Sequence, residues 1–202
     1  MSNIIVLHGT PGSGKTTHAS KFKELYSGGV EHISIGNRLR SIRLGEVKSR
    51  YKSNIDRQTE TLAQSAPLNH EIVNGVVFEF IEKCPATTYV FVDGYPRFLE
   101  QLPLFFESMS QQNNNYLGII SLFISQLTCV DRLTGRKKRP GEKQVTDEFA
   151  LWRFNEYQTH TIPTIARLGA NSTAIDIDAE PPIDVVWANF HDSAQRLIFN
   201  HS

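Results

Sequence analysis

The chain has 202 residues, of which 40% are hydrophobic and 21% are charged, as is usual for a soluble globular domain. Its 21 basic and 21 acidic residues cancel, which argues against a surface that binds nucleic acid through many phosphates. No apolar run reaches the ~18–20 residues of a membrane span, and the apolar run at residues 3–7 is too short for a signal peptide. Cys84 and Cys129 lack the spacing of a metal site. We therefore expect a cytoplasmic protein without membrane partners.

Apolar, β-branched runs alternate along the chain with stretches of helical periodicity. Strands are expected at residues 3–8, 32–35, 88–93, 116–125 and 173–178. Helices are expected from about Lys15 to Tyr26, as small exposed helices within 37–66, over 69–83 with Asn69 as N-cap, and from near Asp147. In the helix over 69–83, the apolar face is expected to comprise Ile72, Val76, Val77, Phe80 and Ile81. This alternation predicts an α/β fold in which five strands form a parallel sheet with helices on both faces.

A phosphate-binding loop is predicted by residues 9–16, GTPGSGKT, which fit the pattern G-x-x-x-x-G-K-[ST] between a strand and a helix. Gly12 and Gly14 let backbone N–H groups turn inward around phosphate oxygens. Lys15 places a positive charge on the β- and γ-phosphates, and the Thr16 hydroxyl suits Mg²⁺. The loop therefore predicts binding of a nucleoside triphosphate.

A second functional segment is VDGYPRFLEQ, residues 92–101. Asp93 ends a buried strand, where a carboxylate can hold the water shell of Mg²⁺. Gly94 allows a ligand to approach the backbone closely, and the Arg97 guanidinium can donate bidentate hydrogen bonds to a phosphate. Gln101 carries an amide that can both accept from and donate to a purine edge. The segment is suited to bind a phosphorylated acceptor.

With these two motifs the sequence resembles the nucleoside monophosphate (NMP) kinases, and most closely the short-lid adenylate kinases. The resemblance extends over nearly the whole chain, through four further segments in the family's order: HISIGNRLR (32–40), PLNHEIV (67–73), DRLTGR (131–136) and RFNEYQTHTIPTI (153–165). It implies a three-layer P-loop kinase fold in one domain, 1–202. The implied core is 1–33, 70–130 and 147–202, with a helical NMP-binding subdomain at about 34–69 and a short lid at about 131–146.

The resemblance also implies roles for particular residues. The residues implied to be catalytic are Lys15, Arg97, Arg132, Arg136 and Arg153. Arg97, with Arg40, would grip the acceptor monophosphate, and the other four would surround the donor and the transferring phosphoryl group. ATP would contact Gly12, Ser13, Gly14, Lys15, Thr16, Thr17, Arg132 and Ala179. The acceptor would contact Ile35, Arg40, Leu68, Gly94, Arg97 and Gln101. Mg²⁺, the implied cofactor, would be held by Thr16 and Asp93, partly through water. Such enzymes bind small-molecule nucleotides, and we expect a monomer.

The chain departs from the family pattern at three places. The family's Thr and Asp in S-T-G-D are Ile35 and Asn37 here. The lid pattern G-R-x-D-D does not occur at its usual distance before Arg153. Either Arg139 or Lys143 replaces the missing lid cation, or the lid works with fewer charges. Both belong to the most basic stretch of the chain, which holds six of the 21 Lys and Arg between residues 132 and 143.

The leading hypothesis is an Mg²⁺-dependent kinase that transfers the γ-phosphoryl group of ATP to AMP. Gln101 favours adenine, because pyrimidine-specific relatives usually carry Asn near that position. Two alternatives stay open: a kinase for another nucleoside monophosphate such as CMP or UMP, and a nucleotide-binding regulatory module with weak or no turnover.

Overall fold

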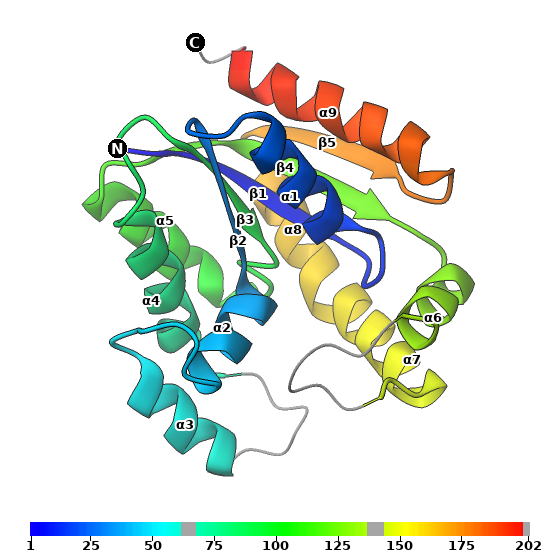
Figure 1. Cartoon of the computed structure of the whole chain (residues 1–202), viewed down its shortest axis with the longest axis horizontal. Helices are drawn as coiled ribbons and strands as arrows, with labels where there is room; N and C mark the ends of the chain where they lie inside the picture. Colours follow the sequence, from blue (N-terminus) through cyan, green and yellow to red (C-terminus); the bar gives the residue numbers. More distant parts are fainter. Residues whose placement is uncertain (62–67, 137–143, 200–202) are drawn as a thin grey trace.

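The computed structural model describes residues 1–61, 68–136 and 144–199 (Figure 1). Within them, strands β1 (Asn3–Gly9), β2 (Val30–Ser34), β3 (Tyr89–Asp93), β4 (Asn115–Phe123) and β5 (Thr173–Asp178) form one sheet in the order β2-β3-β1-β4-β5. Every neighbouring pair is parallel. The predicted five-stranded parallel sheet is confirmed.

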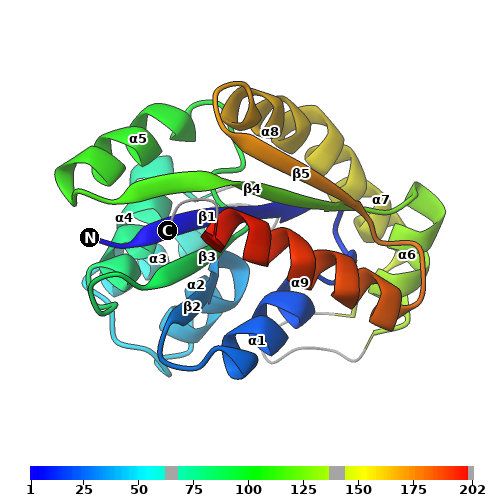
Figure 2. The same ribbon diagram turned by 90° about the horizontal axis from the view of Figure 1, so that it is seen from above.

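Helices cover both faces of this sheet, which confirms the three-layer arrangement (Figure 2). Helices α1 (Lys15–Leu25) and α9 (Ile183–Phe199) lie on one face, and α4 (His70–Ile81), α5 (Gln101–Gln111) and α8 (Ile162–Gly169) lie on the other. Because strand side chains alternate between faces, Ile5 and Leu7 of β1 pack with α1 and α9, and Ile4 and Val6 pack with α4 and α5. All four side chains are fully buried.

Two polar helices, α2 (Ile35–Arg43) and α3 (Lys52–Thr61), follow β2, as expected for the segment 37–66. They join the domain through a small apolar cluster of Ile42, Ile55 and Val76, the last of which belongs to α4. Helix α4 is therefore buried on two sides, by the sheet and by α2 and α3. Val73 and Phe78, which were not part of the expected face, are buried in the sheet-side core, whereas Ile72 and Phe80 of that face are only half-buried.

Local sequence signals set several element boundaries. The Asn69 side chain accepts hydrogen bonds from the backbone N–H groups of Glu71 (2.8 Å) and Ile72 (3.2 Å), which confirms it as the N-cap of α4. Strand β2 begins two residues earlier than expected, at Val30, and Ile35 is the first residue of α2 rather than the last of the strand.

The C-terminal half adds α6 (Gln126–Thr134), α7 (Asp147–Glu156) and a π-helical turn, η1 (Tyr157–Thr161), that leads into α8. The π-helical turn was not expected from the sequence. Helices α7, η1 and α8 are contiguous, and Pro163 lacks the N–H that would donate to residue 159 if they formed one regular α-helix, which favours a wider turn just before it. Among the described residues, no helix combines the length and apolar character needed to cross a bilayer.

Candidate active site

The phosphate-binding loop lies at the carboxyl end of the central strand β1 and opens into α1, as the motif predicts. Gly12 (φ +85°) and Gly14 (φ +89°) both have left-handed backbone conformations, which a side chain would disfavour. A Cβ on Gly9 would lie 1.8 Å from the carbonyl oxygen of Leu122 in β4, so the loop needs glycine there too. Strand packing and backbone conformation together fix the shape of the cradle.

The Lys15 ammonium group folds back into this cradle. Its Nζ donates to the carbonyl oxygens of Gly9 (2.8 Å) and Thr10 (3.0 Å) and to the hydroxyl of Ser13 (3.2 Å). Burial lowers the pKa of Lys15 to about 8; the Asp93 carboxylate opposes this shift, and the charge of Arg153 adds to it. An anion in the cradle would relieve the shift, because it favours the charged amine.

A hydroxyl and a carboxylate meet beside the cradle, as expected for a metal site. Thr16 Oγ1 donates to Asp93 Oδ2 at 2.6 Å. The same carboxylate oxygen lies 3.6 Å from Nε2 of His32 on β2. Burial would raise the pKa of Asp93, but His32, Lys15 and the Thr16 hydroxyl outweigh it and lower that pKa. Asp93 is therefore ionised at neutral pH. His32 was not singled out in the sequence, although its alternation with Val30 along the strand places it on the side of α1.

A cleft of about 490 Å³ separates α1 from α2 next to the cradle. It is lined by the α1 residues Thr16, Thr17 and Ser20, the α2 residues Asn37, Arg40 and Ser41, and by Leu44 and Glu46. Arg40 donates to the side-chain oxygen of Asn37, one helical turn before it. The structure thus brings two predicted ATP contacts, Thr16 and Thr17, to the same cleft as the predicted acceptor contact Arg40.

The loop after β3 carries the predicted acceptor residues Gly94, Arg97 and Gln101. Gly94 has φ +85°, and no described heavy atom lies within 4 Å of the position a Cβ would take, so this turn borders open space. Arg97 is an exposed residue, yet desolvation of its guanidinium by the surrounding protein lowers the pKa of Arg97, and the charge of Glu156 at the end of α7 opposes this effect. The charge of Arg97 also lowers the pKa of Lys15, so the acceptor loop and the phosphate-binding loop belong to one site.

Gln101 has a function in this loop that the sequence did not suggest. Its side chain is 3% exposed, and Oε1 accepts from the backbone N–H groups of Arg97 (2.6 Å) and Phe98 (3.3 Å). The amide oxygen therefore holds the acceptor loop, and only the Nε2 group remains to contact a base.

Two predicted acceptor residues belong to the hydrophobic core in this structure. Ile35 is 5% exposed and packs with Ile33 and Val92 on the side of α4. Leu68 is half-buried and packs against two clusters, the sheet-side core and the small cluster around Ile42. Both lie close to α2 or α4 but contribute mainly apolar packing.

The predicted donor residues lie on the other side of the cradle. Arg132 of α6 packs against the loop, since a Cβ on Gly12 would lie 3.4 Å from the Arg132 Cβ. Ala179, after β5, is buried, and its N–H donates to the Phe123 carbonyl at 2.9 Å. Arg153 of α7 influences Lys15 electrostatically. Arg136 lies two residues after the end of α6, and the lid candidates Arg139 and Lys143 lie outside the described residues.

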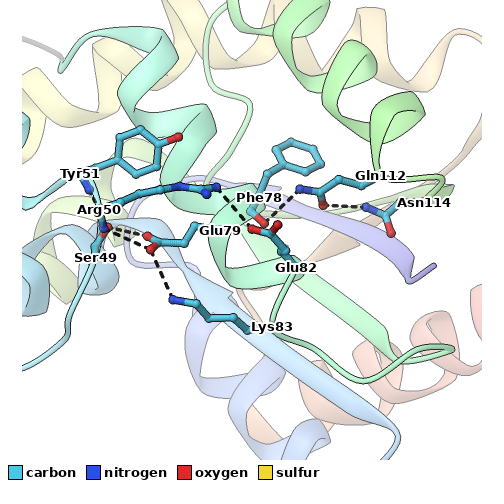
Figure 3. A network of polar contacts seen from close by, with 9 residues as sticks. All are labelled: Ser49, Arg50, Tyr51, Phe78, Glu79, Glu82, Lys83, Gln112 and Asn114. Carbon is cyan, nitrogen blue, oxygen red and sulfur yellow. Dashed lines mark hydrogen bonds and ion pairs between the residues drawn. The ribbon is translucent and has the colours of Figure 1, made fainter.

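A polar network anchors the α2–α3 connection to α4 (Figure 3). The Glu79 carboxylate, 6% exposed, accepts from Ser49 Oγ (2.5 Å), the Arg50 N–H (3.2 Å) and Lys83 Nζ (3.3 Å). Beside it, a Cβ on Gly75 would lie 2.2 Å from the Tyr51 ring, so this mid-helix glycine lets the ring pack on α4. Neither residue was predicted to matter.

The site as a whole combines an anion cradle, an ionised carboxylate and several converging cations from four elements. The charges of Arg97 and Arg153 both act on Lys15. His8 is buried, and that burial lowers its pKa to about 3. A neutral histidine adds no further charge. The arrangement can bind polyphosphates and stabilise negative charge on a phosphoryl group between two loops.

Comparison with known proteins agrees with this chemistry. A family model described as "Adenylate kinase" matches residues 7–173. The chain is 30% identical to an adenylate kinase of Haloarcula marismortui, over 96% of this chain and 97% of that protein. It is 26% identical to an adenylate kinase of Stenotrophomonas maltophilia (91% and 95% covered) and 31% identical to one of a Sulfurovum species (73% of each).

Proposed function

Because the chain belongs to the adenylate kinase family and is an ATP-dependent phosphotransferase of that type, we propose that it transfers the γ-phosphoryl group of ATP to AMP. The observation that carries this proposal is the convergence of the two loops. Thr16 of the phosphate cradle donates to Asp93, which precedes the acceptor loop, at 2.6 Å, and the Gly94 N–H of that loop donates to the Leu7 carbonyl of β1 at 3.1 Å. The charges of Arg97 and Arg153 both act on Lys15. Two phosphorylated ligands bound to these loops would meet at their phosphates.

Catalysis then consists of positioning and charge stabilisation. The transition state of phosphoryl transfer spreads negative charge over the oxygens of the transferring group, and fixed cations stabilise it without a nucleophile on the protein. Lys15 would bind the β- and γ-phosphates, and Arg97 would hold the acceptor phosphate. Arg153, with Arg132 and Arg136 of the donor side, would surround the group in transfer.

The residues at the cradle fit Mg²⁺. This ion prefers oxygen ligands, keeps several waters and takes one or two protein ligands beside the substrate phosphates. The Thr16 hydroxyl and the ionised Asp93 carboxylate, 2.6 Å apart, provide that set. Bound there with ATP, the ion would neutralise charge on the phosphates. The chain's own contribution is to keep Asp93 ionised and aligned through Thr16 and His32.

We propose that the acceptor enters through the cleft between α1 and α2, so that residues 34–69 act as the NMP-binding subdomain. Arg40 in this cleft and Arg97 on the acceptor loop supply two cations for a monophosphate. The anchor at Glu79 would hold the subdomain to α4 during binding. Residues 131–146 would act as the lid on the donor side.

A coupled assay with ATP·Mg²⁺ and a panel of AMP, CMP, UMP and GMP tests the proposal. Turnover that is fastest with AMP supports it. Turnover with another monophosphate only would assign the chain a different acceptor, and tight ATP binding without transfer would support the regulatory alternative. Isothermal titration of ATP alone separates this last outcome from a protein that does not bind nucleotide.

We also propose that the enzyme works as a monomer in the cytoplasm. Its cysteines are unpaired, Cys129 being buried and Cys84 half-buried, which suits a reducing compartment. Gel filtration with light scattering tests the oligomeric state, and a dimer at micromolar concentration would contradict the proposal.

A further inference from the structure

A single carboxylate connects the loop after β5 to the start of α6. Glu180 Oε1 accepts from the Ser125 N–H at 2.6 Å, and Oε2 accepts from the Thr128 hydroxyl at 2.8 Å. The Ser125 side chain also caps α6, since its Oγ accepts from the Thr128 N–H at 3.2 Å. Glu180 thus supplies a negative charge at the N-terminus of α6, where the helix dipole favours one.

Both ends of this connection are fixed by further contacts. On the side of β5, the Glu180 N–H donates to Asp178 Oδ1 at 2.9 Å, and the neighbouring Ala179 N–H donates to the Phe123 carbonyl at 2.9 Å. On the side of α6, the Ile124 N–H donates to Thr10 Oγ1 at 3.3 Å, within the phosphate-binding loop. The carboxylate therefore links two elements that are each attached to the sheet.

Helix α6 also lies directly against the phosphate cradle. The Cβ that Gly12 lacks would be 3.4 Å from Arg132 Cβ and 3.6 Å from the Cys129 carbonyl oxygen. Arg132 follows Thr128 by four residues, so the two share one helical face. Hydrogen bonds from Ser125 and Thr128 lower the pKa of Glu180, and the charge of Arg132 adds to this effect. Glu180 thus acts on the same helical face as Arg132.

These contacts define a place for the nucleoside of the donor. On the side of β3 and β2, the cradle is flanked by Asp93, the acceptor loop and the cleft of α2. A triphosphate in the cradle must direct its nucleoside to the opposite side, where α6 and the Ala179–Glu180 loop follow the carboxyl ends of β4 and β5. The Glu180 bridge spans these two walls beside the hydrogen bond from the Ala179 N–H to the Phe123 carbonyl.

We propose that Glu180 is a positioning residue for the donor nucleoside, which holds α6 and the loop after β5 at the separation that the base requires. The inference rests on the proposed function, because it takes ATP as the ligand of the cradle. Glu180 acts through α6 and the backbone of Ala179, and it does not take part in phosphoryl transfer. Its loss would weaken binding of the nucleoside and leave the binding of phosphates unchanged.

Titration with two ligands tests this separation. ATP·Mg²⁺ reports on the cradle and the nucleoside together, whereas tripolyphosphate·Mg²⁺ reports on the cradle alone. For Glu180→Ala we expect the Kd of ATP to rise roughly 3- to 10-fold, as for one or two lost polar contacts, while the Kd of tripolyphosphate stays within about 2-fold. In turnover, KM for ATP should rise with little change in kcat or in KM for the acceptor.

Two further variants serve as controls. Glu180→Gln keeps one acceptor oxygen for the Ser125 N–H and should recover part of the ATP affinity. Asp184→Asn removes a negative charge four residues later, from an exposed side chain that makes no hydrogen bond or ion pair with another described residue. It should bind both ligands as the wild type does. Because Glu180 is exposed, its variants should fold, which circular dichroism checks.

The outcomes separate this inference from the proposed function. Equal losses of ATP and tripolyphosphate affinity in Glu180→Ala would overturn it, since they would mean that the cradle itself had changed. Unchanged ATP affinity would also overturn it, while wild-type turnover with AMP would leave the proposed function intact. A wild-type protein that binds tripolyphosphate but not ATP would contradict both the role of Glu180 and the proposed function. Since the titrations need no turnover, slow catalysis does not affect the result.

Discussion

The amide of Gln101 has two possible functions, and substitution can separate them. Its buried Oε1 accepts from the backbone N–H groups of Arg97 and Phe98, whereas its Nε2 group remains for a base. Gln101→Leu removes both functions at similar volume. Gln101→Glu keeps the accepting oxygen and replaces the donor with another acceptor.

The magnitude follows from the two hydrogen bonds. A backbone N–H that loses its partner in a buried place costs about 1–3 kcal/mol. Phe98 is half-buried and Arg97 is exposed, so water can reach the freed groups and the lower end applies. We expect Gln101→Leu to lower the free energy of unfolding by about 2 kcal/mol, or Tm by about 4–8 °C for a chain of this size. Gln101→Glu should lose less stability than Gln101→Leu if its two retained hydrogen bonds outweigh the cost of burying its charge.

Kinetics with AMP complete the test. Both variants should raise KM for AMP, by roughly 10-fold for Gln101→Glu, which loses one hydrogen bond to the base. Gln101→Leu should raise it further, because the loop that carries Arg97 is no longer held. Thermal unfolding by circular dichroism and the coupled assay provide both measurements. If Gln101→Leu were as stable as the wild type, Oε1 would not hold the loop; if Gln101→Glu bound AMP normally, the base would not contact Nε2.

Three more predictions concern the charged groups. Ser49, the Arg50 N–H and Lys83 outweigh burial and lower the pKa of Glu79, so its contribution should be present above the unfolded pKa and disappear as pH falls through the folded one. Glu79→Gln should then cost about 1–3 kcal/mol of stability at pH 7 and little at pH 3, and a pH-independent difference in urea unfolding would contradict this. The Lys15 pKa of about 8 should rise when phosphates bind, because an anion favours the charged amine. ATP affinity should therefore fall above pH 8, and binding there should take up a proton, which calorimetry in two buffers measures. Lys15→Met should abolish that uptake. Arg97→Ala should raise KM for AMP and lower kcat while the Kd of ATP stays nearly constant; an equal loss of ATP affinity would remove its assignment to the acceptor.

Much of the fold follows from short-range patterns in the sequence. The strand of residues 3–8 and the glycine-rich loop after it specify a strand, a left-handed turn and a helix without reference to any other part of the chain. Asp93 could be placed beside this loop because acids that end parallel strands meet at one edge of a sheet. The structure agrees, since Leu7 and Asp93 are partners in the register of β1 and β3.

Other features depend on contacts between distant residues and leave little local signal. From the sequence, Glu79 would be interpreted as an exposed charge on a helix. Hydrogen bonds from Ser49 and the Arg50 N–H, which lie about 30 residues earlier, bury it and attach the α2–α3 connection to α4. The apolar face predicted for α4 was incomplete, because the helix is buried on two sides: Val73 and Phe78 pack in the sheet-side core, and Val76 packs with α2 and α3. No local sequence pattern indicated a role for Glu180 either, since its hydrogen-bond partners Ser125 and Thr128 lie more than 50 residues earlier in the chain.

The two departures from the family pattern at the start of α2 have different consequences in the structure. Ile35 is absorbed into the core beside Ile33, where a larger apolar side chain gains burial and a hydroxyl would gain little. Asn37 keeps a polar function, because its oxygen accepts from Arg40 as a carboxylate could. An amide, however, does not neutralise the guanidinium, whereas a carboxylate at this position would compete with a phosphate for it. Asn37 therefore keeps a contact with Arg40 without placing an acid at this position of the cleft that we propose for the acceptor.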